Sequence, residues 1–246
     1  INFLHSYING EHERRARDIL GEELPNAYVS ISSDILPEIR EFERTSTTVV
    51  NAYLGPVLDR YLSALSERLR DFGYDGPMLI THSGGGVMSV EAAREIPARI
   101  CQSGPAAGVM AGANLGRATD RPNVINLDVG GTSADVSLAR GGRPLIRAEW
   151  NINFNITINF PSVDVATIGA GCGSIAPVDT GGVLKVGPES AGARPGPACY
   201  RQGGEAPTVT DANLVLGRLG ADTKLAGRVA LLLFRPCCRN AWRHMI

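Results

Sequence analysis

Apolar residues at helical spacing mark the first third of the chain. Residues 11–24 form an amphipathic pattern, with charges on one side and apolar side chains on the other, which predicts a helix. Residues 27–31 are a short β-prone run. From 41 to 71, apolar residues recur every three or four positions, as in a helix whose apolar stripe faces the core. Pro56 lies inside this stretch, so we expect a kink or a break there.

Between residues 77 and 139, short apolar runs alternate with helical patterns. Loops rich in Gly and Ser separate them, and Ser89 is positioned to cap one helix. This alternation favours an α/β domain with a mixed sheet and flanking helices. We expect buried strands at 77–81, 123–128 and 134–139, and helices at 89–95 and 104–115.

Beyond residue 143 the pattern becomes β-rich. Residues 151–160 alternate polar and apolar side chains over ten positions, the period of a half-buried strand. Gly and Pro then dominate from 167 to 197, and a short helix is expected at 210–219. The sequence therefore predicts an α/β lobe followed by a Gly/Pro-rich β segment.

Composition excludes several classes of protein. The 246 residues are 43% hydrophobic and 20% charged, near the average of globular domains, which excludes collagen-like and disordered chains. Aromatic residues make up 6% and the net charge is −1, so we expect no nucleic-acid partner. No apolar run approaches the length of a membrane span, so we expect no membrane association.

The C-terminal segment differs from the rest. Residues 223–246 carry five basic and no acidic residues, and they include Cys237, Cys238 and Trp242. A basic arm for nucleic acid or membrane is one interpretation. We favour another, in which residues 1–222 are a partial domain and 223–246 are an atypical tail from a truncated or frame-shifted reading frame. Because the chain begins at Ile1 without Met, we also expect it to be a piece of a longer protein.

The five cysteines form no C-x-x-C pair, and the four histidines form no ligand-spaced pair. The cysteine pattern suits a reducing compartment, which favours a cytoplasmic location. It also gives no basis for a zinc site or a disulfide framework.

Residues 124–138 carry the most informative chemistry. A strand ends in Asp128, turns through Gly130 and Gly131 with two hydroxyls, Thr132 and Ser133, and returns as a second strand. Glycines let backbone N–H groups approach phosphate oxygens, and a carboxylate can hold hydrated Mg²⁺. The same pattern also fits an ordinary hairpin, since Gly-Gly between apolar runs is a good turn.

Other segments leave two interpretations open. Ser83–Gly86 could be a second anion-binding loop or a plain strand-to-helix turn, with His82 beside it as an acid–base candidate. The hydroxyls of Thr45–Thr48 could orient a substrate, although helix capping or scaffolding is the preferred interpretation. Arg194 could bind an anion or remain a solvated surface side chain.

Several long motifs, in order, give the chain a family resemblance that runs from residue 1 to about 230. It resembles the hydantoinase A / 5-oxoprolinase family of the actin-like (ribonuclease H-like) ATPase superfamily, which also includes ketone carboxylase subunits. The motifs are EFERTSTTVVNAY (41–53), SGPAAGV (103–109), DVGGTSADVSL (128–138), TIGAGCGSIA (167–176), SAGARPGPACY (190–200) and TVTDANLVLGRL (208–219).

The resemblance implies an actin-like ATPase lobe that uses ATP and Mg²⁺. It implies that Asp128 is catalytic and binds the metal. It further implies a small cyclic amide as substrate, and a hydantoinase B-type partner subunit or fused domain. The residues implied in nucleotide binding are Gly130, Gly131, Thr132, Ser133, Asp135, Gly169, Gly171 and Gly173.

Two departures qualify the resemblance. The family carries another D-x-G-G-T loop near its N-terminus, and these 246 residues contain none besides 128–132, so we expect half of a nucleotide clamp. The family loop also reads TIGAGGGS, whereas Cys172 replaces the middle glycine here. A positive φ at this position would strain Cys172; a negative φ would make the substitution tolerable.

The function implied is part of an ATP-dependent cyclic-amide hydrolase, in which phosphorylation of a lactam or hydantoin carbonyl oxygen precedes ring opening by water. One alternative is a ketone carboxylase subunit with bicarbonate as co-substrate. A second is a non-catalytic lobe that binds nucleotide weakly or only pairs with a partner. A small-molecule kinase is a further option.

Overall fold

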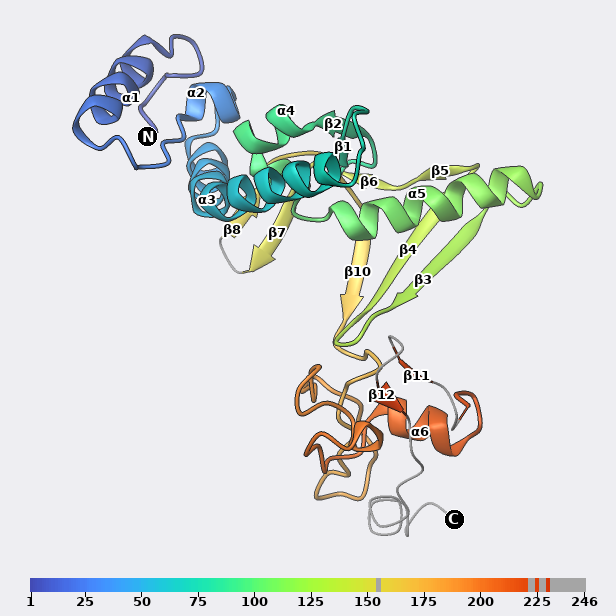
Figure 1. Ribbon diagram of the computed structural model, residues 1–246. Helices are drawn as coiled ribbons and strands as arrows, with labels where there is room; N and C mark the ends of the chain where they lie inside the picture. The colour runs from blue at the N-terminus through green and yellow to red at the C-terminus, as the bar shows by residue number, and fades with distance from the viewer. Residues whose placement is uncertain (154–155, 221–223, 226–228, 231–246) are drawn as a thin grey trace. The chain divides into compact units, whose positions relative to one another are not determined.

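The computed structural model describes residues 1–153, 156–220, 224–225 and 229–230 (Figure 1). Its α-helices are α1 (Glu11–Glu23), α2 (Ser32–Ile35), α3 (Glu41–Asp71), α4 (Val90–Glu95), α5 (Ser103–Ala118) and α6 (Val209–Val215), and two 3₁₀ turns are η1 (Pro97–Ile100) and η2 (Ala198–Tyr200). Its strands are β1 (Leu79–Thr81), β2 (Val87–Ser89), β3 (Val124–Val129), β4 (Ala134–Arg140), β5 (Arg143–Pro144), β6 (Ile146–Arg147), β7 (Trp150–Asn153), β8 (Ile156–Ile158), β9 (Ser162–Val163), β10 (Val165–Ile168), β11 (Lys224–Leu225) and β12 (Val229–Ala230).

The chain forms two compact units. The first comprises residues 1–124 and 138–164, and the second comprises 125–137 and 165–246, so β3 and β4 contribute to both. The expected domain boundary at 222 and most of the expected basic tail lie outside the described residues; within that tail, only 224–225 and 229–230 are described, as the antiparallel pair β11 and β12.

One sheet has the order β10-β4-β3, with β5 pairing onto β4. β10 runs antiparallel to β4, with Val165 opposite Ser137 and Ile168 opposite Ala134. β3 was expected to be buried, but Ile125 and Leu127 are 73% and 66% exposed. β3 is the edge strand of the sheet, so only one neighbour covers it.

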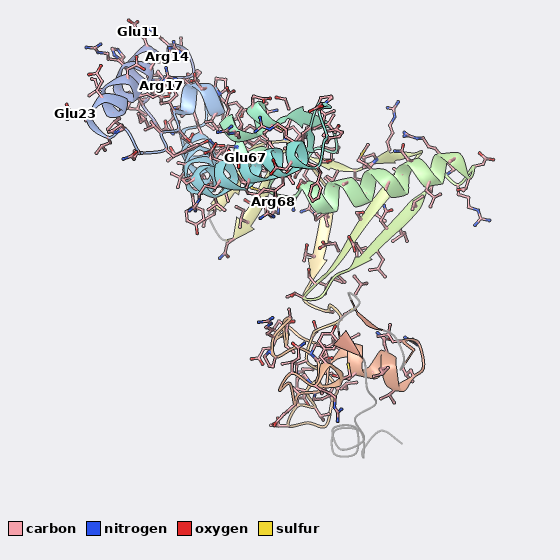
Figure 2. The ribbon with its side chains drawn as sticks, in the orientation of Figure 1. Glu11, Arg14, Arg17, Glu23, Glu67 and Arg68 are labelled. Carbon is pink, nitrogen blue, oxygen red and sulfur yellow. The ribbon has the colours of Figure 1, made fainter. Side chains whose placement is uncertain are left out.

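In the first unit, α3 organises the core. Leu62 packs with residues of α4 and η1, while a second cluster joins Ile35 and Leu36 to Ile158 and Phe160. α3 is one continuous helix of 31 residues that includes Pro56, so the expected break does not occur. Exposed charged side chains of these helices include Glu11 on α1 and Glu67 on α3, both labelled in Figure 2.

The run at 27–31 was expected to be a strand, and it is not. Its residues lie along α3: the Tyr28 ring occupies the space that a Cβ on Gly55 would need, and Asn51 Nδ2 donates to Ser30 Oγ at 3.0 Å. This segment contacts α3, and no described strand pairs with it. The segment is therefore irregular despite its β-prone composition.

The alternating run at 151–160 is two strands rather than one. β7 and β8 pair antiparallel, with Trp150 opposite Ile158. β8 is anchored to α3, because Ser46 Oγ accepts the N–H of Thr157 at 2.9 Å and Thr47 Oγ1 accepts that of Asn159 at 3.0 Å. The hydroxyls of Ser46 and Thr47 thus scaffold β8, in line with the preferred interpretation, while those of Thr45 and Thr48 donate to carbonyl groups within α3. None of them caps the helix.

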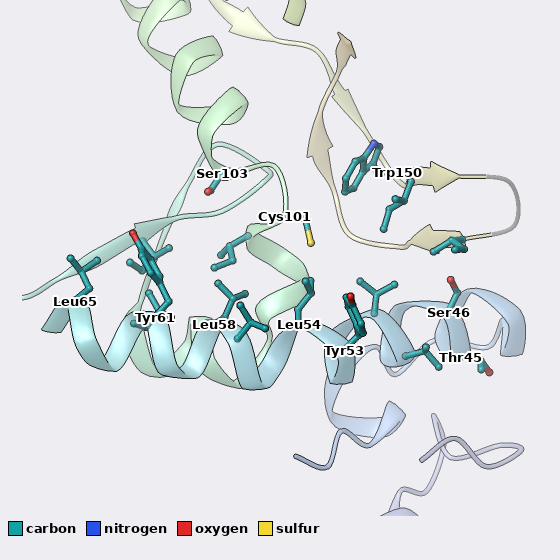
Figure 3. A pocket seen from close by; sticks show the side chains of 18 of the residues that line it. Thr45, Ser46, Tyr53, Leu54, Leu58, Tyr61, Leu65, Cys101, Ser103 and Trp150 are labelled. Atoms are coloured by element: carbon teal, nitrogen blue, oxygen red, sulfur yellow. The ribbon is translucent and has the colours of Figure 1, made fainter. Parts of the chain in front are cut away.

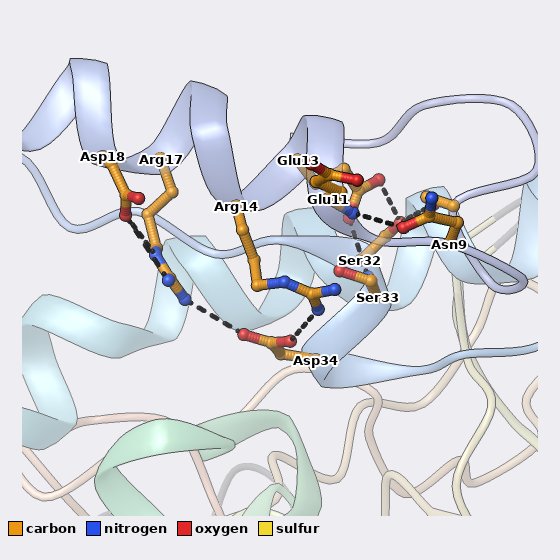
Figure 4. Close-up of polar contacts among 10 residues, drawn as sticks. Asn9, Glu11, Glu13, Arg14, Arg17, Asp18, Ser32, Ser33 and Asp34 are labelled. Carbon is orange, nitrogen blue, oxygen red and sulfur yellow. Dashed lines mark hydrogen bonds and ion pairs between the residues drawn. The ribbon is translucent and has the colours of Figure 1, made fainter.

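The N-terminal 35 residues are fastened by two buried charged side chains. Glu13 accepts hydrogen bonds from Phe3 N (2.7 Å), Ser32 Oγ (2.6 Å) and Ser33 N (2.8 Å), and Figure 4 shows it reaching from α1 toward α2. Burial alone would raise its pKa, but these hydrogen bonds outweigh it and lower the pKa to about 2. Arg44 is fully buried and donates to Asn2 Oδ1 and Phe3 O. Ile19 and Leu24, expected on the buried side of α1, are exposed instead.

Candidate nucleotide-binding site

The loop at residues 130–133 joins β3 to β4 and lies entirely in the second unit. A hydrogen bond from Gly130 N to Ser133 O, 2.9 Å long, closes it into a tight turn. Gly130, Gly131 and Thr132 are exposed, and Ser133 is half-buried. The strand–turn–strand arrangement expected from the sequence is therefore present.

A second Gly-rich loop, residues 169–174, packs against the first through the backbone. Three consecutive N–H groups of this loop donate to three consecutive carbonyl oxygens of the 130–133 loop. The bonds run from Gly171 N to Thr132 O (3.2 Å), from Cys172 N to Gly130 O (2.9 Å) and from Gly173 N to Gly131 O (2.6 Å). The carbonyl groups of Gly130, Gly131 and Thr132 therefore all accept hydrogen bonds from the second loop.

Three N–H groups of the same loop are unpaired among the described residues. Within the part of the chain that the structure describes, the N–H groups of Gly131, Thr132 and Ser133 donate no hydrogen bond. Successive unpaired N–H groups in an exposed turn are the feature that binds phosphate oxygens in Gly-rich loops. The exposed turn therefore offers three unpaired N–H donors to an anion.

The glycines of the two loops have different roles. A Cβ on Gly171 would lie 2.5 Å from Ser133 N and from Thr132 C, and one on Gly173 would lie 2.9 Å from Gly131 O. A Cβ on Gly131 would meet nothing within 4 Å. Gly171 and Gly173 thus permit the two backbones to pack, whereas Gly131 leaves open space beside the free N–H groups.

Cys172 is accommodated without strain. It is not among the residues with positive φ, which settles the alternative left open by the sequence in favour of a tolerated substitution. Its side chain is half-buried, and its carbonyl accepts hydrogen bonds from both Thr210 N and Thr210 Oγ1 at 2.8 Å.

The two candidate carboxylates differ in their surroundings. Asp128, on β3, is exposed, and its carboxylate makes no hydrogen bond or ion pair with any described residue. Asp135, on β4, accepts a 2.7 Å hydrogen bond from Thr167 Oγ1 on β10. Asp128 is therefore available to a cation, and Asp135 stabilises the strand pair. A Cβ added to Gly169, which follows β10, would have Pro188 as its nearest neighbour, at 3.5 Å.

No cluster of three His, Cys, Asp or Glu side chains that could hold a metal occurs among the described residues. Mg²⁺ accepts one or two carboxylates together with phosphate oxygens and water. Beside the 130–133 turn, Asp128 offers one exposed carboxylate.

The Ser83–Gly86 turn is built differently. Three of its N–H groups already have protein acceptors. Ser83 N donates to Arg99 O at 2.7 Å, Gly84 N donates to His82 Nδ1 at 3.1 Å and Gly85 N donates to His82 O at 2.9 Å. Burial, with a contribution from the Arg99 charge, lowers the pKa of His82. This favours the plain-turn interpretation, although the turn leads into β2 rather than directly into a helix. Arg194 is exposed, as a solvated side chain would be.

Sequence reasoning missed the residues that support the 169–174 loop. Ser174 is fully buried; its Oγ accepts the N–H of Gly171 at 2.8 Å and donates to Thr132 O at 3.4 Å. Thr208 and Asp211 form a capping box at the start of α6. The T-x-x-D spacing was the signal available in the sequence, since it is typical of a helix N-terminus.

It also missed an open apolar cavity of about 1050 Å³ along α3, in the first unit (Figure 3). Part of the apolar stripe expected in the core lines this cavity, and Val57 and Tyr61 are 58% and 60% exposed. Trp150 lies on the opposite wall, and Ile156 also lines the cavity.

Among the described residues, no helix combines the length and the apolar character needed to cross a bilayer.

Comparisons with known proteins place the chain. The profile of the hydantoinase/oxoprolinase family matches residues 44–231. The chain is 42% identical to caprolactamase subunit alpha of Pseudomonas jessenii, with 94% of this chain and 33% of the relative covered. It is 39% identical to 5-oxoprolinase of Saccharomyces cerevisiae, with 89% of this chain and 17% of the relative covered.

Solved structures agree. A nucleotide-free acetone carboxylase structure superimposes with a TM-score of 0.82 at 33% identity, covering 98% of this chain and 34% of that one. The crystal structure of the ATP-dependent caprolactamase from Pseudomonas jessenii gives a TM-score of 0.73 at 41% identity, with the same coverage. The expected α/β lobe of actin-like ATPase type is confirmed. The chain spans about a third or less of the length of these relatives, and it belongs to the hydantoinase/oxoprolinase family.

Proposed function

We propose that this chain is part of an ATP-dependent cyclic-amide hydrolase, and that the 130–133 loop binds the phosphates of the nucleotide. The observation that carries the proposal is the unequal hydrogen bonding of this exposed loop. Its carbonyl groups are bonded to the 169–174 loop, and the N–H groups of Gly131, Thr132 and Ser133 are free.

Each residue of the loop has a role that its geometry supports. The three free N–H groups bind phosphate oxygens, and the open space at Gly131 admits them. The hydroxyls of Thr132 and Ser133 add short donors. Asp128, without an internal partner, holds Mg²⁺ against the same phosphates. Asp135 joins β4 to β10 through Thr167, and Gly171 and Gly173 permit the two loops to pack. Contact of Asp135, Gly169, Gly171 and Gly173 with the nucleotide, which the family resemblance implies, stays a prediction.

Transfer of a phosphoryl group from ATP to the lactam carbonyl oxygen, with release of ADP, would activate the carbonyl carbon toward water. The C–N bond would then break with the ring nitrogen leaving as the amine, and a second water would hydrolyse the resulting acyl phosphate to carboxylate and phosphate. The protein's contribution to phosphoryl transfer is positioning and neutralisation of charge. A loop of N–H donors with one carboxylate provides this from one side. The 246 residues contain one D-x-G-G-T loop, so the facing donors come from outside them.

Ketone carboxylation is the second candidate, because a structural relative catalyses ATP-dependent acetone carboxylation. There the same loop would activate a substrate with bicarbonate present. Other relatives are named as alpha, beta and gamma subunits, which supports a partner subunit. We propose that this partner is of hydantoinase B type, as the family resemblance implies. The cysteine pattern supports a cytoplasmic location.

The test is phosphate release from Mg²⁺-ATP by the full-length protein that contains this chain, co-expressed with its partner subunit. A cyclic-amide hydrolase releases phosphate faster when caprolactam or 5-oxoproline is added. Stimulation only by acetone with bicarbonate would select the carboxylase. No stimulation by either class, together with no nucleotide binding in calorimetry, would remove the proposal.

A further inference from the structure

We propose that Thr210 is a positioning residue for the 130–133 loop and acts on it through Cys172; this proposal rests on the nucleotide site proposed above. Thr210 lies in the first turn of α6 and is 4% exposed. Its Oγ1 and its N–H both donate to the carbonyl oxygen of Cys172, each at 2.8 Å.

The position of Thr210 is itself fixed by its neighbour. The Asp211 carboxylate is 5% exposed, and both of its oxygens are occupied. Its Oδ2 accepts from Thr208 N (2.9 Å) and Thr208 Oγ1 (2.7 Å), and its Oδ1 accepts from Cys199 N (2.8 Å). This capping box ties α6 to η2, so Thr210 has a defined place that does not depend on a ligand.

Residue 172 connects Thr210 to the nucleotide loop. The carbonyl of Cys172 faces Thr210, and its N–H donates to Gly130 O at 2.9 Å. The neighbouring N–H groups of 171 and 173 occupy the next two carbonyls of the 130–133 loop. The Thr210 hydroxyl therefore helps to hold the backbone strip 171–173, whose N–H groups bind the carbonyl groups of the 130–133 loop.

Loss of this hydroxyl would loosen the strip without touching the nucleotide. The 130–133 loop would then sample more conformations before binding, and ordering it would reduce the affinity. One buried hydrogen bond contributes about 0.5–1.5 kcal/mol, which corresponds to a loss of roughly 2- to 10-fold in affinity.

The experiment uses the full-length protein with Thr210→Val, Thr210→Ser and a matched control, Thr48→Val. Thr48 is a buried threonine on α3, 3% exposed, whose Oγ1 donates to Arg44 O at 2.7 Å in the other unit. It reproduces the burial and the type of hydrogen bond of Thr210 in the unit that does not contain the 130–133 loop.

Two measurements test the role of Thr210. The first is hydrogen exchange of backbone amides 130–133 and 171–173 without nucleotide, and the second is the dissociation constant of Mg²⁺-ATP from calorimetry. We expect faster exchange at both loops and a 2- to 10-fold weaker dissociation constant for Thr210→Val. Thr210→Ser should stay within about twofold of the parent, because it keeps the hydroxyl. Thr48→Val should lower the melting temperature and leave both measurements unchanged.

Unchanged exchange at both loops in Thr210→Val would overturn the proposal, as would equal changes in Thr48→Val. If the parent protein does not bind Mg²⁺-ATP, the proposed function fails, and the exchange data still decide whether Thr210 orders the loops. Binding by the parent with an unaltered dissociation constant in Thr210→Val overturns only the role of Thr210.

Discussion

Gly171 lies so close to Thr132 that a methyl group on its Cα would come within 2.5 Å of the Thr132 carbonyl carbon. That distance is shorter than any van der Waals contact, so the two loops can pack only with glycine at 171. Gly131 presents the opposite case, with no atom within 4 Å of its potential Cβ. Substitution of Gly171 therefore tests the packing of the two loops, and substitution of Gly131 tests ligand binding.

We expect Gly171→Ala to lower the free energy of unfolding by about 1–3 kcal/mol, the usual cost of forcing extra volume into a packed site. Gly131→Ala should change it by less than about 0.5 kcal/mol, as at other open surface positions. It should nevertheless weaken Mg²⁺-ATP binding, because the methyl group would occupy space beside the free N–H groups. Urea unfolding and calorimetry measure the two effects. Equal destabilisation by both substitutions would contradict this account.

Asp128→Ala should abolish ATP turnover in the full-length protein and leave the fold intact. Asp128 is exposed and has no partner among the described residues, so its removal should alter stability by less than about 0.5 kcal/mol. Loss of a charged ligand to the metal should reduce turnover by about 100-fold or more. Asp71→Ala, an exposed aspartate at the end of α3, is the control and should keep full turnover. Undiminished phosphate release by Asp128→Ala would remove this carboxylate from the mechanism.

The sequence predicted the local features of the site well. The 130–133 turn depends on Gly-Gly between two apolar runs, and the helices at 11–23, 41–71 and 103–118 depend on spacing within each segment. These features are decided by residues near one another in the chain. The partner of the 130–133 loop was not predictable in the same way, because backbone bonds to residues 171–173 leave no periodic signal.

Burial was harder to predict than secondary structure. The apolar stripe of α3 has the same spacing whether it faces a core or an open cavity, and only Leu62 of the predicted stripe is fully buried. Alternation over 151–160 likewise fits one strand or two antiparallel strands, and the structure has two. In both cases the outcome depends on segments distant in the sequence.

Two residues of that stripe should differ strongly in their effect on stability. Leu62 is 1% exposed and packs with Val90, Ala93 and Ile100, so Leu62→Ala should cost about 2–5 kcal/mol in the free energy of unfolding. Val57, 58% exposed at the cavity, should cost less than about 1 kcal/mol when replaced by Ala. Urea denaturation of both variants tests this. A similar cost for both would mean that the face of α3 at Val57 is covered in solution.

The stability conferred by Glu13 should depend on pH in the acidic range. Its pKa is lowered from 4.5 to about 2, because four hydrogen bonds to the carboxylate, including one from Ser32, outweigh the effect of burial. A lowered pKa means that the unfolded state binds the proton more readily. The contribution of Glu13 is thus complete above pH 4.5, declines as the pH falls from 4.5 toward 2, and is lost below about 2.

The difference in unfolding free energy between the parent protein and Glu13→Gln isolates this contribution from the other titrating groups. We expect the difference to be constant from pH 7 to about 5 and to shrink steadily from pH 4.5 toward 2.5. Glu22→Gln, at an exposed position on the same helix, is the control and should change the free energy of unfolding by less than about 0.5 kcal/mol. A Glu13→Gln difference that stayed constant down to pH 2.5 would show that this carboxylate is not held in its charged form by Phe3, Ser32 and Ser33.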